Sequence, residues 1–172
     1  MCKNNPEQLK QLNIGDGQLE YDYLLGKRSL QTIGTKGLNQ AVDDYYINKK
    51  DAVDQMEEFF KKHYALEAER PFLNHLLQKI EFREDRLIGL SILLMRDGTE
   101  VESVKFGMLL TKYYDISSVP RALEILKNLC LHPAFVYYGL DILKNIDYGI
   151  IDEIHEKSYG LGKKIIEEKI WK

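Results

Sequence analysis

The stretch of sequence that decides the fold occupies residues 88–93 and reads Ile-Gly-Leu-Ser-Ile-Leu. The same kind of core, a small residue inside a run of apolar side chains, returns in three further segments. These segments are residues 106–110, 121–126 and 138–143. The small residues are Gly89, Gly107, Ala122 and Gly139, so every second segment returns after 33 residues (from 89 to 122) or 32 residues (from 107 to 139).

A repeat of helix, short turn and helix at this period is typical of an α-solenoid, in which successive helix pairs stack. Glycine or alanine at the repeated position lets two helices approach closely, and this packing offsets the roughly 1 kcal/mol that glycine costs inside a helix. The repeat is clearest over residues 84–146 and extends more loosely to residues 50–80. The sequence therefore predicts an all-α fold of six to nine helices stacked as antiparallel pairs, in a single domain spanning residues 1–172.

Glycine, proline and apolar spacing guide the prediction for the N-terminal part of the chain. Residues 1–40 are punctuated by glycine and are expected to be irregular, and the run 19–24 fits either a short strand or a helix. Apolar i, i+3, i+4 spacing predicts one helix over residues 38–47 and an amphipathic helix over residues 52–64. Pro71 is expected in the first turn of the next helix, where proline is favoured.

Capping signals predict the helices at the start of the repeat. A helix from about Glu84 is expected to end at Gly98, since glycine fits a left-handed position after the last helical turn. Thr99 and Glu102 have the spacing of a capping box, which would open a helix that continues to about Tyr114.

Proline marks the two helices that follow. Ser117 or Ser118 is expected to cap a helix whose first turn contains Pro120. Pro133 is expected to open the next helix, which ends near residue 145, and His132 is expected to help cap it.

Composition and charge exclude several classes of protein. Apolar residues make up 44% of the 172 residues, which is enough for a core. The net charge is -3 with a pI of about 5.8, and lysines stand beside acids, as at Glu57-Glu58 and Lys61-Lys62. Nucleic-acid binding usually shows as a basic patch, so no nucleic-acid partner is expected. Two cysteines are too few for a disulfide scaffold, and Cys130 is expected to be a buried small apolar residue.

The sequence also predicts where the protein is found. The longest apolar run, residues 87–95, is interrupted by Gly89 and Ser91 and falls short of the ~20 residues that span a bilayer. Cys2 lies in a polar start with no hydrophobic stretch before it, which argues against a signal or lipoprotein sequence. We expect a cytoplasmic protein that binds no membrane.

Motifs of common active sites are missing from the sequence. It contains no His-Glu-x-x-His, no Cys-x-x-Cys and no Gly-x-Ser-x-Gly. Gly160 and Gly162 lack the full phosphate-loop pattern and are interpreted as a break before a terminal helix. One acid and histidine cluster admits a metal or general-base site, although a solvated helix face is favoured. Its members are Asp152, Glu153, His155 and Glu156. We expect no catalytic residue, no metal, no cofactor and no enzymatic activity.

The repeated core of a small residue, Leu, any residue, Ile and Leu, as in residues 122–126 and 139–143, resembles that of HEAT-like repeats. The ladder of Asp and Arg side chains typical of more regular HEAT arrays is missing. With its turn Asp97-Gly98-Thr99-Glu100-Val101 and the helix after it, the chain is similar to compact immunity proteins of bacterial polymorphic-toxin systems. The resemblance implies a HEAT-like α-solenoid and a bacterial protein that binds another protein, a cognate toxin domain, and neutralises it.

Two other functions stay open at this point. One is a HEAT-like adaptor or scaffold subunit within a larger assembly. The other is a HEAT-like DNA-repair glycosylase, which needs a basic concave face that a net acidic chain of mixed charge does not predict. The sequence leaves the oligomeric state open.

The repeat also predicts which side chains face outward. Tyr137, Asp141 and Lys144 lie at i, i+4 and i+7, away from the apolar side of their helix. A shift of 32 residues relates Lys105 to Tyr137 and Lys112 to Lys144. In a solenoid the second helix of each pair lines the concave surface, and exposed tyrosine favours protein contact. The predicted partner-binding stripe is Lys105, Lys112, Tyr137, Asp141, Lys144 and Tyr148.

Overall fold

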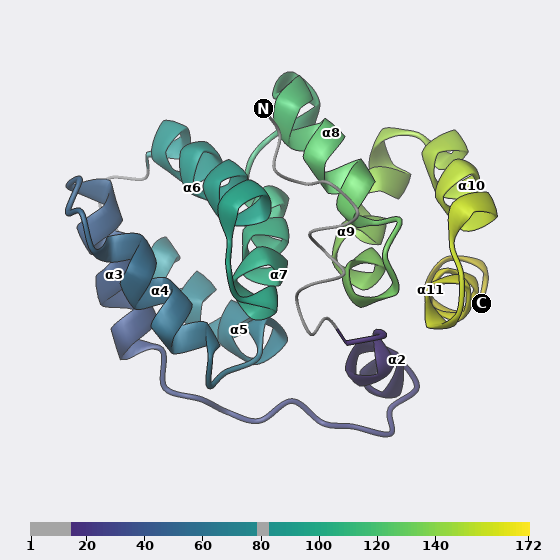
Figure 1. Cartoon of the computed structure of the whole chain (residues 1–172), viewed down its shortest axis with the longest axis horizontal. Coiled ribbons are helices and arrows are strands. Elements are labelled where there is room, and N and C mark those ends of the chain that lie inside the picture. The colour runs from purple at the N-terminus through teal and green to yellow at the C-terminus, as the bar shows by residue number, and fades with distance from the viewer. Residues whose placement is uncertain (1–14, 79–82) are drawn as a thin grey trace. The chain divides into compact units, whose positions relative to one another are not determined.

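The structure, a computed structural model, describes residues 15–78 and 83–172, and within them it is helical with no strand (Figure 1). The all-α class is therefore confirmed. The described residues form ten α-helices, α2 to α11, joined by short 3₁₀ turns and followed by a terminal π turn. Ten helices exceed the six to nine predicted. The excess comes from short helices such as α2 (Gln18–Leu24) and α11 (Leu161–Ile166), which have only 7 and 6 residues. The expectations for Cys2 and for residues 1–14 lie outside the described residues.

The chain divides into two compact units. One, unit 2, is the continuous segment Leu30–Leu110, and the other, unit 1, combines the residues up to Ser29 with Thr111–Lys172. Each unit has its own apolar core, and the two helix pairs of the sequence repeat fall one in each unit. Within the described ranges no helix is long and apolar enough to cross a membrane.

Unit 2 is built around one central helix. Its helices are α3 (Lys36–Tyr46), α4 (Ala52–Phe60), α5 (Ala65–Leu77), α6 (Glu84–Asp97) and α7 (Val101–Leu110). Helix α7 contacts α4, α5 and α6, and every residue from Ser103 to Leu110 is buried. Phe106 of α7 lies with its ring centroid 5.0 Å from those of both Phe60 and Phe72. Aromatic rings at this separation add to the apolar burial that holds the helices together.

Helix α5 begins six residues earlier than proline placement predicted. Pro71 lies inside the helix, where its missing N–H removes one backbone hydrogen bond. The start is set at Ala65, whose backbone N–H donates to the Glu102 carboxylate of α7 at 2.8 Å. This tertiary contact supplies a cap that the local sequence does not contain, so the prediction of a helix start at Pro71 is wrong.

The turn between α6 and α7 also differs from the prediction. Gly98 has φ -54, so it is not left-handed. Glycine is needed there for space, because an added Cβ would lie 2.5 Å from the Leu94 carbonyl oxygen. The expected capping box is wrong as well: the N–H groups of Thr99 and Glu100 donate to the Glu57 carboxylate of α4, at 3.1 and 2.8 Å. The buried carboxylate of Glu57 on α4 therefore stabilises the start of α7, just as the carboxylate of Glu102 stabilises the start of α5.

Gly107 confirms the close helix approach predicted for the repeated small residue. An added Cβ would lie 2.8 Å from the Leu94 Cβ and 3.0 Å from the Met95 backbone nitrogen, both on α6. Ser91 of α6 donates its hydroxyl to the Gly107 carbonyl at 2.9 Å. The two helices therefore contact each other through their backbones at this point.

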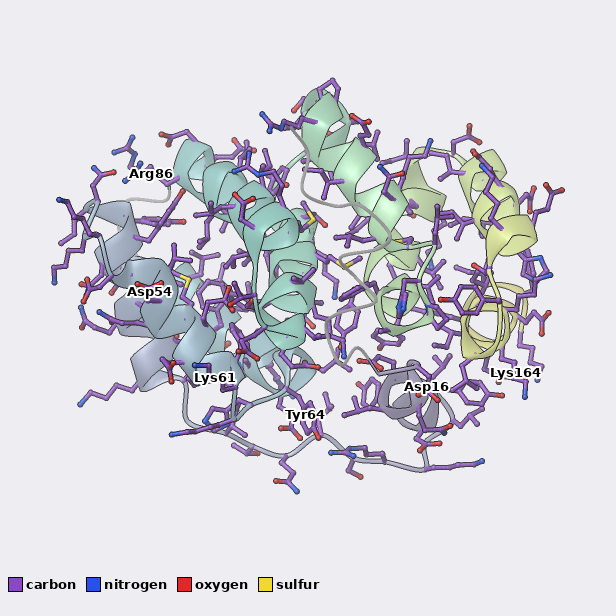
Figure 2. The ribbon with its side chains drawn as sticks, in the orientation of Figure 1. Asp16, Asp54, Lys61, Tyr64, Arg86 and Lys164 are labelled. Carbon is purple, nitrogen blue, oxygen red and sulfur yellow. The ribbon has the colours of Figure 1, made fainter. Side chains whose placement is uncertain are left out.

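Unit 1 is centred on a single long helix. Its elements are α2, the 3₁₀ turns Thr111–Tyr113 and Ile116–Ser118, α8 (Pro120–Leu129), α9 (Pro133–Ile146), α10 (Tyr148–Lys157), α11 and the π turn Glu167–Trp171. Helix α9 contacts α2, α8, α10 and α11. Figure 2 shows side chains filling the space between helices, with charged residues such as Lys164 at the outside.

Local signals predict the helix starts of unit 1 well. Pro120 and Pro133 both stand in the first turn of their helices, as expected. The His132 ring accepts a hydrogen bond from the Ala134 N–H at 3.2 Å, which confirms its capping role. The predicted serine cap of α8 is wrong: Ser117 and its neighbour lie in a 3₁₀ turn that is itself capped by a side chain, that of the preceding aspartate.

The repeated glycine of α9 also permits close packing. An added Cβ at Gly139 would overlap the Cys130 sulfur and lie 3.5 Å from Leu126 of α8. Cys130 is fully buried, as predicted, and burial raises the pKa of its thiol to about 12. Gly89 differs, because its nearest neighbour is the Tyr45 hydroxyl of α3 at 3.0 Å. Gly89 therefore does not bring α6 and α7 into close contact.

Residues 19–24, which the sequence left as strand or helix, form helix α2. Glu20 of α2 is 1% exposed and accepts a hydrogen bond from the Tyr138 hydroxyl of α9 at 2.7 Å. Gly17, which precedes the helix, has φ +86, and a Cβ there would lie 2.5 Å from the Pro133 carbonyl oxygen. Only glycine fits both the left-handed backbone and this contact. Gly160, with φ +55, breaks the chain before α11 as predicted.

Candidate partner-binding surface

The predicted stripe is centred on the less buried face of α9. Phe135, Val136 and Leu140 on the other side of this helix are 0% exposed and belong to the core. Tyr137 and Asp141 share the opposite face but are half-buried rather than exposed. The spacing therefore predicts the face correctly and overestimates how open it is.

A groove of about 530 Å³ lies beside this face of α9. It runs between the segment 111–117 and the second half of α9. Its lining residues are Thr111, Lys112, Tyr114, Asp115, Ile116, Ser117, Asp141, Ile142, Asn145 and Ile146. Both charged and apolar side chains therefore line the groove.

Lys169 of the terminal π turn holds Asp141, one of the residues that line the groove. Its ammonium lies 2.8 Å from Asp141 Oδ2 and donates to the Tyr137 carbonyl at 2.9 Å. It also lies 3.8 Å from the centroid of the Tyr137 ring, which is a cation–π contact. Asp141 receives a second ammonium from Lys144 at 3.2 Å. One carboxylate is therefore shared by two lysines.

This geometry explains the directions in which the pKa values of Asp141 and Lys169 shift. Burial opposes ionisation of Asp141, but the hydrogen bond and charge of Lys169 and the ion pair with Lys144 outweigh it, so the pKa of Asp141 lies below its usual value. Burial lowers the pKa of Lys169, the Asp141 contact offsets part of this, and the positive charges of Lys112 and Lys144 lower it again.

A pH titration of stability tests the Asp141 pairing. An acid whose pKa is lowered on folding adds stability above its unfolded pKa, and this stability is lost as the pH falls through the folded pKa. The difference in unfolding free energy between wild type and Asp141→Asn should be constant above about pH 5 and should shrink below 3.8. Urea unfolding across this range measures it. A difference as large at the acid end as at neutral pH would contradict the pairing, and a Lys169→Gln background should weaken the pH dependence.

The structure distributes the six predicted residues unevenly. Lys112 and Asp141 line the groove, and Lys144 adjoins it through its ion pair. Tyr148 is 57% exposed at the first position of α10, two residues after the lining residue Ile146.

Lys105 does not belong with the other five. It is 6% exposed, lies in unit 2 and pairs with Glu102 at 2.7 Å. The expectation that it faces outward is wrong. Helix α7 packs against three helices of its unit, which bury Lys105. The 32-residue shift therefore relates similar sequence patterns in the two units, but the matched side chains differ in exposure.

Sequence reasoning missed Lys169 and the two isoleucines of α9 that line the groove. Lys169 reaches Asp141 from a segment outside the repeat, and no periodic signal relates the two positions. Ile142 and Ile146 were detectable, because their i, i+4 spacing lies outside the Leu140 and Leu143 core stripe.

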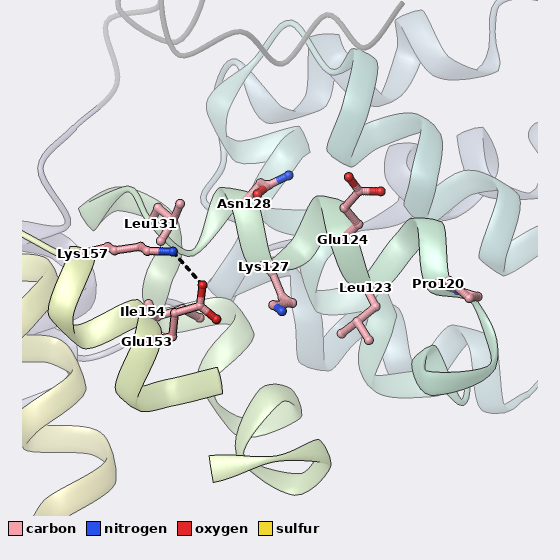
Figure 3. A pocket seen from close by; sticks show the side chains of 9 residues that line it. All are labelled: Pro120, Leu123, Glu124, Lys127, Asn128, Leu131, Glu153, Ile154 and Lys157. Atoms are coloured by element: carbon pink, nitrogen blue, oxygen red, sulfur yellow. Dashed lines mark hydrogen bonds and ion pairs between the residues drawn. The ribbon is translucent and has the colours of Figure 1, made fainter. Parts of the chain in front are cut away.

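A second groove of about 320 Å³ lies between α8 and α10 (Figure 3). Its floor is apolar, with Leu123, Leu131 and Ile154. Its charges are balanced, and Glu153 and Lys157 point toward each other at 2.6 Å in an ion pair. Because none of the predicted stripe residues lines it, the groove beside α9 is the stronger candidate.

The acid and histidine cluster of α10 is dispersed in the structure. Glu153 pairs with a lysine of its own helix, and His155 lies 3.2 Å from Glu167 with its ring centroid 4.7 Å from that of Trp171. Across residues 15–78 and 83–172, no three His, Cys, Asp or Glu side chains gather as a metal site would require.

Comparison with known proteins adds no assignment. No family model matches the chain, and neither the curated proteins nor the solved structures contain a match.

Proposed function

We propose that the chain is a non-enzymatic protein-binding module of the bacterial cytoplasm, and that its partner is a toxin domain that it neutralises. The observation that carries the proposal is the groove beside α9, where two predicted stripe residues, Lys112 and Asp141, stand next to exposed apolar side chains. Ile146 is 37% and Tyr148 57% exposed. Apolar and aromatic side chains surrounded by charge are typical of protein interfaces.

The HEAT-like solenoid is part of the same proposal. Gly107 in the α6/α7 pair and Gly139 in the α8/α9 pair occupy equivalent positions of the sequence repeat, and each permits close contact with the preceding helix. In this proposal the two pairs are successive repeats. An experimental structure in which residues 84–110 and 120–146 do not superpose would contradict it.

Two exposed tyrosines provide a matched test of the binding surface. Tyr148→Ala should weaken partner binding by about tenfold or more, since an aromatic residue at an interface centre can carry ~2 kcal/mol. Tyr159→Ala is the control, because Tyr159 is 58% exposed and lies two residues beyond the C-terminal end of α10. Titration calorimetry measures both affinities with the partner protein recovered by affinity capture, and melting temperatures should not change. Equal affinity of the two variants would place the contact elsewhere, with the exposed acids Asp152 and Glu156 as the next surface to test.

The two alternative functions predict different results. A HEAT-like adaptor would bind a partner without abolishing any toxicity, so growth of cells that express the partner with and without this chain separates the two. A toxin-domain gene beside that of this chain favours immunity. A HEAT-like glycosylase would shift duplex DNA with strong salt dependence. The net charge of -3 argues against it.

A further inference from the structure

The ammonium group of Lys169 lies in a site that α9 provides. It is 3.8 Å from the centroid of the Tyr137 ring, 2.8 Å from Asp141 Oδ2 and 2.9 Å from the Tyr137 carbonyl oxygen. An aromatic face, a carboxylate and a carbonyl oxygen together suit a lysine side chain, which carries a positive charge and three N–H donors. All three groups belong to one turn of α9, whereas Lys169 comes from the terminal π turn.

Helix α9 holds this site in place. Val136 and Leu140 are 0% exposed, so the core fixes the helix on either side of Tyr137 and up to Asp141. Tyr23 of α2 lies edge-on to the Tyr137 ring, with the ring centroids 6.2 Å apart. These contacts do not involve the terminal turn, so they position the Tyr137 ring and the Asp141 carboxylate independently of Lys169.

The terminal turn that supplies Lys169 is held more lightly. The last two residues of α11 are 0% exposed, whereas none of residues 167–171 is buried. The turn also contacts His155 of α10, which lies 3.2 Å from Glu167 and edge-on to the ring of Trp171. Trp171 is 47% exposed. Release of the turn from α9 would therefore expose little apolar surface while α11 stays in the core.

The position of Lys169 carries a cost of its own. Its side chain is only 12% exposed, and burial lowers its pKa, which the ion pair with Asp141 offsets in part. A buried ion pair gains little over the same two groups in water, because both must lose their hydration. A lysine from another protein would make the same contacts as Lys169. Exchange between the two would change the free energy little, so contacts elsewhere in the interface would decide it.

We propose that Tyr137 and Asp141 form a receptor for a lysine side chain of the partner protein. Lys169 occupies this receptor in the free chain and is displaced, together with the terminal turn, when the partner binds. The inference rests on the proposed protein-binding function and names the group of the partner that the surface recognises. It also explains why Tyr137, a predicted contact residue, is half-buried in the free chain.

The probe is Nα-acetyl-lysine methylamide, titrated into the full-length protein. We expect shifts of amide NMR signals within residues 135–145 and, in the wild type, a change in the fluorescence of the single tryptophan, Trp171, as it leaves His155. Lys169 competes with the probe, so Lys169→Ala should bind it about tenfold more tightly than the wild type does. Nα-acetyl-glutamine methylamide has no positive charge and should shift none of these signals.

Matched variants extend the test to the recovered partner. Lys169→Ala should strengthen partner binding about tenfold, because the internal competitor is removed. In that background Asp141→Asn should weaken binding about tenfold or more, because the partner's lysine loses its carboxylate. Lys164→Ala is the control, since it removes an exposed lysine of α11 and should change neither affinity. If Lys169→Ala is unfolded by circular dichroism, Lys169→Met replaces it and keeps the apolar stem of the side chain.

Several results would overturn the inference. If Lys169 has only a structural role, Lys169→Ala will lower the melting temperature and bind probe and partner no better than the wild type. Equal shifts with the glutamine probe, or shifts confined to residues outside 135–145, would show that no lysine receptor exists here. If the partner loses affinity with Tyr148→Ala but does not respond to Lys169→Ala, the inference fails while the proposed function stands. If no protein neutralised by the chain exists, the function fails, and the probe still decides whether the site takes a lysine.

Discussion

Gly107→Ala is expected to lower the free energy of unfolding by roughly 2 kcal/mol, after the helix-propensity gain of about 1 kcal/mol is taken into account. The added methyl group would meet the Leu94 Cβ at 2.8 Å, the Met95 nitrogen at 3.0 Å and the Ser91 carbonyl oxygen at 3.1 Å. Two of these atoms belong to the backbone of α6 and cannot rotate away. The helices must separate, which also strains the Ser91 hydroxyl bond to the Gly107 carbonyl.

Gly89→Ala is the matched control for this change. It places a methyl group in the other helix of the same pair, near the end of the Tyr45 side chain, the only neighbour within 4 Å in the part of the chain described. A flexible side chain can yield, so the higher helix propensity of alanine should leave stability unchanged or raised by up to about 1 kcal/mol. Urea unfolding of both variants makes the comparison. Equal stabilities would refute the close approach of α6 and α7.

Glu57→Ala is expected to cost roughly 3 kcal/mol of unfolding free energy, because it removes a buried carboxylate that accepts hydrogen bonds from three donors at the start of α7. The Glu57 carboxylate accepts from the backbone N–H of Thr99 at 3.1 Å and of Glu100 at 2.8 Å, and from the Ser103 hydroxyl at 2.8 Å. No other helix of unit 2 has its first turn held by a buried carboxylate with three such bonds among the described residues. Loss of this cap should loosen α7, the centre of the unit.

Two further variants separate capping from other effects of the substitution. Glu57→Gln keeps one carbonyl oxygen as an acceptor and should lose less stability than Glu57→Ala. Glu58→Ala removes the adjacent exposed acid, which pairs with a surface lysine, and should change stability little. Chemical denaturation followed by circular dichroism measures all three. A Glu57→Ala protein as stable as Glu58→Ala would show that the cap contributes nothing.

The sequence predicts helices whose ends depend on neighbouring residues and fails where the ends depend on distant ones. Pro120, Pro133 and His132 act within one turn of their helices, so their roles were readable. Helix α5 starts at Ala65 because Glu102 reaches it from 37 residues away. No local pattern contains that contact, and the same holds for the cap that Glu57 gives to α7.

The candidate surface shows the same contrast between features set by local sequence and features set by distant contacts. Helical spacing placed Tyr137, Asp141 and Lys144 on one face of α9, which the structure confirms. It could not show that Lys169 covers this face, since the terminal segment carries no periodic relation to α9. Tyr137→Ala should therefore disturb packing, so exposed Tyr148 is the better residue for a binding test.

The division of unit 1 along the chain bears on the order of folding during synthesis. Glu20 and Tyr138, whose hydrogen bond ties α2 to α9, are 118 residues apart. A ribosome adding about 5–20 residues per second completes the whole of residues 30–110 before the docking site of α2 exists. Until then α2, with only 7 residues, lies below the length at which an isolated helix persists in water. Closing so long a loop carries an entropic cost that rises with the logarithm of its length. Helix α2 is thus synthesised before residues 30–110 but reaches its native contacts only after them.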